Sequence, residues 1–264
     1  MLELKHISKT FFPGTVNAKT ALNDLSLTLH DGDFVTVIGG NGAGKSTMLN
    51  AVAGTLIVDS GSILLDGEDI TRKPEHRRAA DLGRVFQDPM MGTAGDMWIE
   101  ENLALAARRG SRRTFKWGIS HEERERYREL LAPLGLGLED RLTAKVGLLS
   151  GGQRQALTLL MASLKKPKLL LLDEHTAALD PKTAAKVLEL SDRIVEENGL
   201  TTMMVTHNMK DAIAHGNRLI MMDAGRVVLD ICGWEKQKLT VPDLLALFSE
   251  AGGTDAADDK LLLA

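Results

Sequence analysis

The stretch Gly39-Gly40-Asn41-Gly42-Ala43-Gly44-Lys45-Ser46-Thr47 decides the fold of this chain. It fits the pattern G-x-x-x-x-G-K-[ST] and lies between an apolar run at 34–38 and a helix expected at 45–53. Glycines let backbone N–H groups curl around phosphate oxygens, and the start of a helix adds partial positive charge. The Lys45 ammonium can reach the outer phosphates, and the Ser46 hydroxyl can bind Mg²⁺. The stretch therefore predicts a phosphate-binding loop.

A second motif places two acids at the end of an apolar run. Leu169–Leu172 leads into Asp173 and Glu174, and this pattern predicts a buried strand with carboxylates at its carboxyl end, where open α/β sheets bind ligands. Asp173 would hold Mg²⁺ through water, and Glu174 would polarise the attacking water as a general base. Two acids at a strand end are common in themselves, but a phosphate loop in the same chain needs a partner acid for its metal.

A third motif, Leu149-Ser150-Gly151-Gly152-Gln153, precedes another expected helix. Ser150 can cap that helix, while Gly151 and Gly152 leave backbone N–H groups accessible to an anion. With these three motifs, the chain resembles the nucleotide-binding subunits of ATP-binding cassette (ABC) transporters, over about residues 2–231. A P-loop kinase or GTPase would not explain the third motif.

Alternating strand and helix patterns predict an α/β fold. The resemblance implies a P-loop NTPase (RecA-like) core sheet with a small antiparallel β subdomain and an all-helical insert. We expect an ATPase domain over 1–235, with the insert at about 88–162, and a C-terminal helix and acidic tail over 236–264. Strands are expected at 25–29, 34–38, 62–65, 83–86, 168–172, 201–205, 218–222 and 226–231. Helices are expected at 45–53, 99–108, 121–131, 152–164, 181–197, 208–215 and 242–250.

The resemblance also implies roles for single residues. Gln87 matches the glutamine loop, Asp180 the loop that crosses to a partner subunit, and His207 the switch histidine. Phe11 is the better match for the aromatic that stacks on adenine, with Phe12 as the alternative. The expected catalytic residues are Glu174, His207, Gln87 and Lys45. The expected ATP-binding residues are Phe11, Gly39, Asn41, Gly42, Ala43, Gly44, Lys45, Ser46, Thr47, Gln87 and His207. The expected Mg²⁺ ligands are Ser46, Gln87 and Asp173, and the residues expected to act on the partner's ATP are Ser150, Gly151, Gly152, Gln153 and Asp180.

Two positions depart from the family pattern. His175 stands where the family usually has proline after the catalytic glutamate, and nothing in the sequence indicates its effect. A phenylalanine stands where tyrosine is commoner at the adenine position, so that residue can stack but cannot donate a hydrogen bond. Neither departure removes a catalytic group.

Composition narrows the possible partners. The 264 residues carry 32 Lys and Arg against 36 Asp and Glu, a net charge of −4, which argues against a nucleic-acid partner. The single cysteine, Cys232, excludes a disulfide within the chain. The sequence contains no run of 18 apolar residues, so it predicts no membrane span. The composition predicts a cytoplasmic protein, and the resemblance to ABC transporter subunits implies that it is peripheral on the cytoplasmic face of the cell membrane.

The resemblance implies an ATPase that uses ATP and Mg²⁺, dimerises around ATP and drives a membrane importer. Its expected partners are a second copy of the chain, integral permease subunits and, indirectly, an extracytoplasmic substrate-binding protein. Stretches such as GRVFQDPMMGTA and DEHTAALDPKTAAKVLEL resemble importer ATPases assigned to amino acids of the tryptophan or tyrosine type. The alternative is a soluble ABC ATPase without a permease, for example in cluster assembly.

Overall fold

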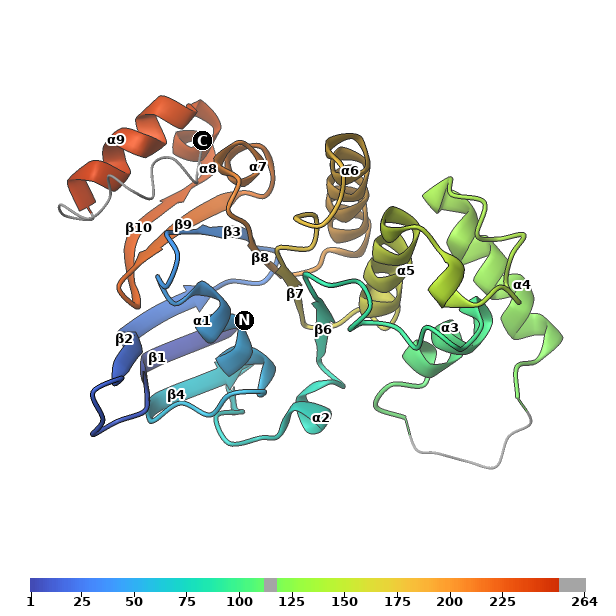
Figure 1. Ribbon diagram of the computed structural model, residues 1–264, viewed down its shortest axis with the longest axis horizontal. Helices are drawn as coiled ribbons and strands as arrows, with labels where there is room; N and C mark the ends of the chain where they lie inside the picture. Colours follow the sequence, from blue (N-terminus) through green and yellow to red (C-terminus); the bar gives the residue numbers. More distant parts are fainter. Residues whose placement is uncertain (112–117, 252–264) are drawn as a thin grey trace. The chain divides into compact units, whose positions relative to one another are not determined.

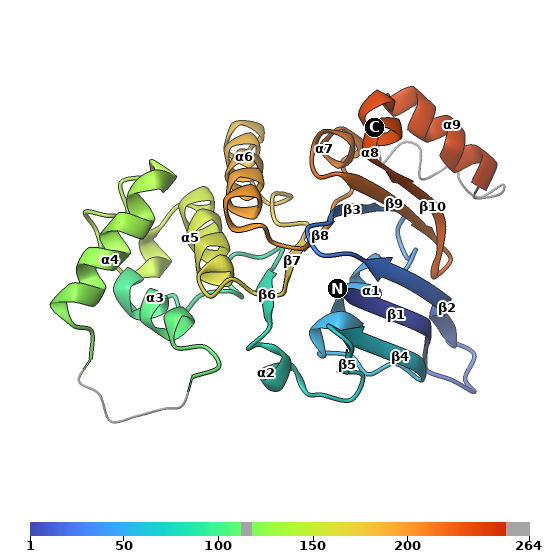
Figure 2. The ribbon, with the colours of Figure 1, turned by 180° about the vertical axis from the view of Figure 1, so that it is seen from behind.

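The computed structural model describes residues 1–111 and 118–251, and Figures 1 and 2 show it from opposite sides. Its contacts divide the chain into two compact units. The first comprises Met1–Arg78 and Gly199–Ala264, and the second comprises Ala79–Asn198. In the part of the chain that the structure describes, no helix has both the length and the apolar character to cross a membrane.

Strands from two sheets form the framework of the first unit (Figure 1). The strands of this unit are β1 (Leu2–Phe11), β2 (Lys19–Leu29), β3 (Phe34–Ile38), β4 (Ser60–Leu65), β5 (Glu68–Asp69), β8 (Thr202–Val205), β9 (Arg218–Asp223) and β10 (Arg226–Cys232). In the antiparallel sheet, β1 lies between β2 and β4, and β5 pairs with β4. In the other sheet, β3 lies between β8 and β9 and is parallel to both, while β10 runs antiparallel to β9. All five residues of β3 are buried, as its apolar run predicts for a central strand.

Five helices complete the described part of the first unit. They are α1 (Lys45–Ala53), α2 (Glu75–Arg78), α7 (Met209–Ala214), α8 (Gly233–Lys238) and α9 (Val241–Ala251). The apolar face of α9 packs into a core with α7 and β9, where Leu244 is 0% and Phe248 is 3% exposed. Burial of such side chains stabilises a fold by roughly 1.5–3 kcal/mol each, so α9 belongs to the core of this unit. Residues 252–264, the predicted acidic tail, lie outside the described residues.

The second unit joins a pair of strands to a group of helices. Its elements are β6 (Leu82–Val85), α3 (Ile99–Ala107), α4 (His121–Leu131), α5 (Gly151–Ser163), β7 (Leu169–Asp173), α6 (Pro181–Asn198) and short 3₁₀ helices at Ala132–Leu134 and Val146–Leu148. Strands β6 and β7 are parallel, with Leu82 opposite Leu169. Leu103 of α3, Leu131 of α4 and Leu157 of α5 are fully buried in one apolar cluster, which explains why these three helices gather together.

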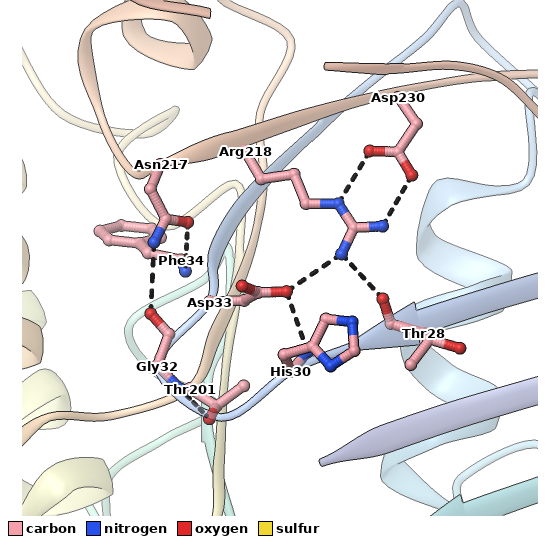
Figure 3. A network of polar contacts seen from close by, with 9 residues as sticks. All are labelled: Thr28, His30, Gly32, Asp33, Phe34, Thr201, Asn217, Arg218 and Asp230. Carbon is pink, nitrogen blue, oxygen red and sulfur yellow. Dashed lines mark hydrogen bonds and ion pairs between the residues drawn. The ribbon is translucent and has the colours of Figure 1, made fainter. Parts of the chain in front are cut away.

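An arginine network fixes the start of β3 (Figure 3). Arg218, on β9, donates two hydrogen bonds to the Asp230 carboxylate, at 2.8 and 2.6 Å. Its Nη1 donates to the Thr28 carbonyl at 2.8 Å and to Asp33 Oδ2 at 3.0 Å. These acceptors raise the pKa of Arg218 above its ordinary value, the Asp230 hydrogen bonds most of all and against the effect of burial. The network thus ties β9 and β10 to the turn between β2 and β3.

The prediction of a mixed α/β fold is confirmed, and most expected elements are present within a few residues of their predicted bounds. Strand β1 was not expected at Leu2–Phe11, because its side chains do not alternate regularly. The pairing of β1 with β2 shifts register three times, and His6 has a φ of 50°, so the buried face changes parity along the strand. Helix α8 was also missed, because its sequence, GWEKQK, has no apolar period.

Candidate active site

The loop between β3 and α1 has a backbone that only glycine adopts easily. Gly39, Gly42 and Gly44 have φ values of 150°, 82° and 101°. A Cβ on Gly39 would lie 2.2 Å from the carbonyl oxygen of Met222, and one on Gly44 would lie 2.4 Å from that of Ala21. The loop is therefore pressed against two neighbouring backbones, and its glycines form the tight cradle that a phosphate group needs.

Lys45 and Ser46 stand at the start of helix α1, next to this cradle. Lys45 is only 8% exposed, and its Nζ donates to the carbonyl oxygens of Gly39 at 2.6 Å and Gly40 at 3.0 Å. Gly44 occupies the N-cap position and has no side chain with which to cap the helix. The N–H groups of the first turn of α1 and a buried ammonium thus belong to one short segment, and such a concentration of donors suits an anion.

His207 lies at the same edge of the sheet as the phosphate loop. Gly39 follows β3 and His207 follows β8, and these two strands are parallel neighbours, so their carboxyl ends meet. The His207 side chain is exposed, and the next residue, Asn208, caps α7 through its Oδ1, which accepts hydrogen bonds from the N–H groups of Lys210 and Asp211. The structure therefore places His207, a predicted site residue, at the carboxyl ends of β3 and β8 with its side chain exposed to solvent.

The two candidate adenine platforms differ in exposure. Phe11 ends β1, is partly buried and lies opposite Lys19 of β2. Phe12 is 69% exposed and has a φ of 50°. Lys19 connects this hairpin to the phosphate loop, because its Nζ lies 2.9 Å from the position that a Cβ on Gly42 would occupy. No predicted site role falls on Lys19, which stands between Ala18 and Thr20.

In the second unit, two predicted residues lie at the carboxyl ends of the parallel strands β6 and β7. Gln87 is exposed and comes two residues after β6, and Asp173 is the last residue of β7. Asp173 is 16% exposed and forms an ion pair with Arg84, with 3.2 Å between its Oδ2 and the Nη2 of Arg84. Glu174 is partly buried and has a φ of 43°, which is rare for a residue with a side chain and is often found at functional sites.

The predicted cap at Ser150 is present. Ser150 Oγ accepts a hydrogen bond from the Gln153 N–H at 3.3 Å, and Gln153 Oε1 accepts one from the Ser150 N–H at 3.1 Å. This reciprocal pair is a capping box, and Gln153 Nε2 also donates to the carbonyl of Leu136 at 3.2 Å. The side chain of Gln153 is therefore bound both to the start of its own helix and to Leu136, while Ser150 itself and Gly151 are exposed.

Asp180 caps helix α6. Its Oδ1 accepts a hydrogen bond from the Thr183 N–H at 3.1 Å, and Pro181 takes the first helical position, where a missing N–H costs nothing. The hydrogen bonds from the side chain and the backbone of Thr183 lower the pKa of Asp180. The role of Asp180 toward a partner subunit stays a prediction.

Each unit holds some of the predicted site residues. The structure brings Lys45, Ser46 and the glycines together with His207 in the first unit, and Gln87 with Asp173 and Glu174 in the second. Ser150–Gln153 and Asp180 also belong to the second unit. Arg84 carries no predicted role; its signal in the sequence is a single charge within the otherwise apolar segment Gly83–Phe86.

The donors fit Mg²⁺ in their chemistry. Ser46, Gln87 and Asp173 offer a hydroxyl, an amide and a carboxylate, and Mg²⁺ prefers such oxygen ligands. Among the residues that the structure describes, no group of three or more His, Cys, Asp or Glu side chains could hold a metal ion. A metal held by so few protein oxygens takes its other ligands from water and substrate phosphates, as Mg²⁺ does in phosphoryl transfer.

A glycine cradle with a buried lysine, acids at the end of a parallel strand and a second capped glycine-rich helix start define a P-loop nucleoside triphosphatase. Residues 22–177 match the family model described as ABC transporter. The chain is 47% identical to the tyrosine transport ATP-binding protein of Clostridioides difficile (strain R20291). The match extends over 251 residues, which are 95% of this chain and 100% of that protein.

Other known proteins agree with this match. The chain is 35% identical to the spermidine/putrescine import ATP-binding protein PotA of Haemophilus influenzae. That match extends over 230 residues, which are 87% of this chain and 57% of that protein. A dimeric bacterial ABC transporter cassette has a TM-score of 0.75 and 30% identity, over 88% of this chain and 98% of that chain. A dimeric post-hydrolysis state with ADP and Pi gives a TM-score of 0.74. The chain belongs to the ABC transporter family of ATP-binding proteins, and it is an ATPase.

Proposed function

We propose that this chain is the ATP-hydrolysing subunit of a membrane importer and that two copies dimerise around ATP. The cargo that we propose is an amino acid of the tyrosine or tryptophan type. Family membership and the relatives' import and transport names support the importer role. The 47% identity with a tyrosine transport ATP-binding protein supports the cargo. The observation that carries the proposal is the glycine cradle at Gly39–Gly44 in one chain with the capped helix start at Ser150.

Each expected catalytic residue has a chemical task on this proposal. Lys45, which donates to the loop carbonyls, binds the outer phosphates of ATP and neutralises their charge. Glu174 accepts the proton of the attacking water, and Gln87 and His207 orient that water and the γ-phosphate through hydrogen bonds. Ser46, Gln87 and Asp173 would hold Mg²⁺, which would offset the charge that develops on the phosphates.

The dimer follows from the second helix start. Ser150–Gln153 of one subunit would bind the γ-phosphate of ATP held by the other subunit, with Asp180 beside them. Two such contacts are related by a twofold axis, so the interface uses the same surface on both copies. Loss of the γ-phosphate removes the anion that both helix starts face, and the dimer then opens. The dimeric cassettes among the solved relatives support this arrangement.

Met90 and Met91 offer a docking surface for the permease. They follow Gln87 in the chain and are 51% and 68% exposed. Flexible thioether side chains suit an adaptable apolar interface, so we propose that they contact a cytoplasmic segment of the permease. The chain would then be peripheral on the cytoplasmic face of the membrane, and an extracytoplasmic binding protein would meet the permease rather than this chain.

The dimer is tested with Glu174→Gln, which removes the proposed base and keeps the size of the side chain. With saturating ATP and Mg²⁺, we expect a stable dimer by size-exclusion chromatography with light scattering, and hydrolysis reduced at least about 100-fold. Lys45→Ala is the matched control, which should weaken ATP binding and remain monomeric. A Glu174→Gln variant that stays monomeric would contradict the ATP-bound dimer.

The importer role is tested by purification of the tagged chain from detergent-solubilised membranes. An integral permease that co-purifies, followed by stimulation of ATPase activity by a binding protein loaded with tyrosine or tryptophan, is the expected result. A soluble complex without a permease would favour the alternative, a cluster-assembly ATPase.

The adenine platform is tested by Phe11→Ala and Phe12→Ala, of which the first should lower ATP affinity and the second should not.

A further inference from the structure

Arg84 joins the proposed Mg²⁺ carboxylate to the start of the glutamine loop. In the parallel pair of β6 and β7, Arg84 lies opposite Leu171, two residues before Asp173. Side chains two residues apart lie on the same face of a strand, so Asp173 extends from the face that Arg84 occupies. The guanidinium reaches forward along that face, and its Nη2 lies 3.2 Å from Asp173 Oδ2.

The same guanidinium lies over an aromatic ring. Its central carbon is 4.6 Å from the centroid of the Phe86 ring, within the range of a cation–π contact. Phe86 directly precedes Gln87, and its carbonyl accepts a hydrogen bond at 3.2 Å from Nε2 of Gln155, a fully buried side chain of α5. Arg84 is therefore held on one side by the carboxylate and on the other by the segment that leads into Gln87.

The pair is shielded from water. The Arg84 side chain is 13% exposed and that of Asp173 is 16% exposed, so their attraction is weakened by solvent less than that of a surface pair. The contact is made through Oδ2, which leaves Oδ1 outside this ion pair. A fixed positive charge at this position also repels any cation that approaches the same carboxylate.

We propose that Arg84 sets the Mg²⁺ affinity of the site, as an internal counter-ion with which Mg²⁺ must compete for Asp173. This inference rests on the proposed function of Asp173 and goes beyond it. Without metal, Arg84 keeps a partly buried carboxylate paired and oriented, which avoids the cost of an isolated buried charge. When the carboxylate binds Mg²⁺, its hold on Arg84 weakens, and the contact with Phe86 carries that change to the residue before Gln87.

The test measures nucleotide binding without turnover. For each variant, the Kd of a non-hydrolysable ATP analogue is measured with excess Mg²⁺ and again with a chelator. The ratio of the Kd with chelator to the Kd with Mg²⁺ reports how strongly Mg²⁺ supports binding, and a higher ratio means stronger support. Arg84→Met and Arg84→Gln remove the charge, and we expect their ratio to rise about tenfold above that of the unaltered chain. Arg84→Lys keeps the charge and should restore the ratio to within about twofold.

A matched control is Arg109→Met, because Arg109 is a second partly buried arginine of the same unit and its Nη2 donates to the carbonyl of Ala162 at 3.1 Å. Its ratio should not change. An unchanged or smaller ratio in both neutral Arg84 variants, or a lysine variant that behaves like them, would overturn the inference. If Arg84→Met does not fold, the glutamine and lysine variants decide.

Asp173→Asn separates this inference from the function on which it rests. We expect this variant to lower the ratio, because the metal loses a charged ligand. If it does so and the neutral Arg84 variants match the unaltered chain, the inference on Arg84 fails alone. If Asp173→Asn leaves the ratio unchanged, Asp173 does not hold the metal, and the proposed role of Asp173 fails together with the inference.

Discussion

His175 donates a hydrogen bond to Ser191 inside the second unit, across 3.0 Å between Nε2 and Oγ. Both side chains are buried, at 2% and 1% exposure. The direction follows from the serine, whose single hydroxyl proton goes to the Val187 carbonyl at 2.8 Å. Ser191 Oγ therefore accepts, and Nε2 of His175 carries the proton. This bond attaches His175, the residue after Glu174, to helix α6. At the position of His175 the family usually has proline.

Ser191→Ala should destabilise the chain, because it leaves the buried His175 Nε2–H without this acceptor. We expect the free energy of unfolding, measured with urea, to fall by about 1–3 kcal/mol. Ser163→Ala is the matched control, since Ser163 is also buried and its hydroxyl donates back to the Leu159 and Leu160 carbonyls of its own helix. Equal losses for the two variants would contradict a specific role for the His175 bond.

Gly39→Ala should abolish ATP binding, because the new Cβ would lie 2.2 Å from the Met222 carbonyl oxygen and the loop would have to move. The free energy of unfolding should also fall, by about 2–4 kcal/mol. The control is Gly67→Ala, where φ is also positive, at 77°, but no atom lies within 4 Å of the added Cβ. That variant should cost only about 1 kcal/mol and should keep its ATP affinity. Retained ATP binding by Gly39→Ala would show that the cradle is not needed.

The sequence predicts the phosphate loop and the capped helix start because both depend on local chemistry. Gly39–Gly44 and Ser150 act through their own backbone and the residues next to them, and such signals lie within one short segment. Arg84 and His175 could not be assigned in the same way. Their partners, Asp173 and Ser191, are 89 and 16 residues away in the chain, so the contacts exist only in the folded structure.

The same distinction explains why helix α8 and strand β1 were missed. Helix α8 exists because Lys236, which is 1% exposed, inserts among backbone carbonyls at the end of α7, where its Nζ donates to those of Ile213, His215 and Gly216. A lysine predicts exposure in a sequence, and only tertiary contacts reverse that preference. Strand β1 was missed for a related reason, because the bulge at His6 breaks the alternation on which strand prediction depends.

Asp211→Asn should raise the stability of the chain at about pH 7. Burial raises the pKa of Asp211 above its ordinary value of 3.8, and nearby His215 and His207 oppose that shift only in part. A carboxyl with a raised pKa in the folded state destabilises the fold when both states are ionised. The gain from asparagine should therefore be present above the folded pKa and vanish as the pH falls below 3.8, where both states are protonated.

The measurement for Asp211→Asn is the urea midpoint of unfolding of the variant and of the unaltered chain, from about pH 7 down to below pH 3.8. Asp96→Asn serves as a control, since the side chain of Asp96 is fully exposed and its Oδ1 lies 3.9 Å from the Nζ of Lys145. It should leave the midpoint nearly unchanged at every pH. A difference for Asp211→Asn that grows as the pH falls would contradict the burial of this carboxyl as the cause.

Lys19→Met should weaken the binding of ATP. The Lys19 ammonium lies 2.9 Å from the position of a Cβ on Gly42, so a positive charge stands directly beside the phosphate loop and attracts the anion held there. At low salt, the Kd for ATP should rise about threefold to tenfold. The effect should shrink as salt is added, because the side chain is exposed and its charge is screened over about 10 Å at 0.1 M. The control is Lys5→Met, which makes the same change in net charge at an exposed lysine paired with Glu3. If Lys19→Met and Lys5→Met shift the Kd equally, the effect comes from the overall charge and not from the place of Lys19 at the loop.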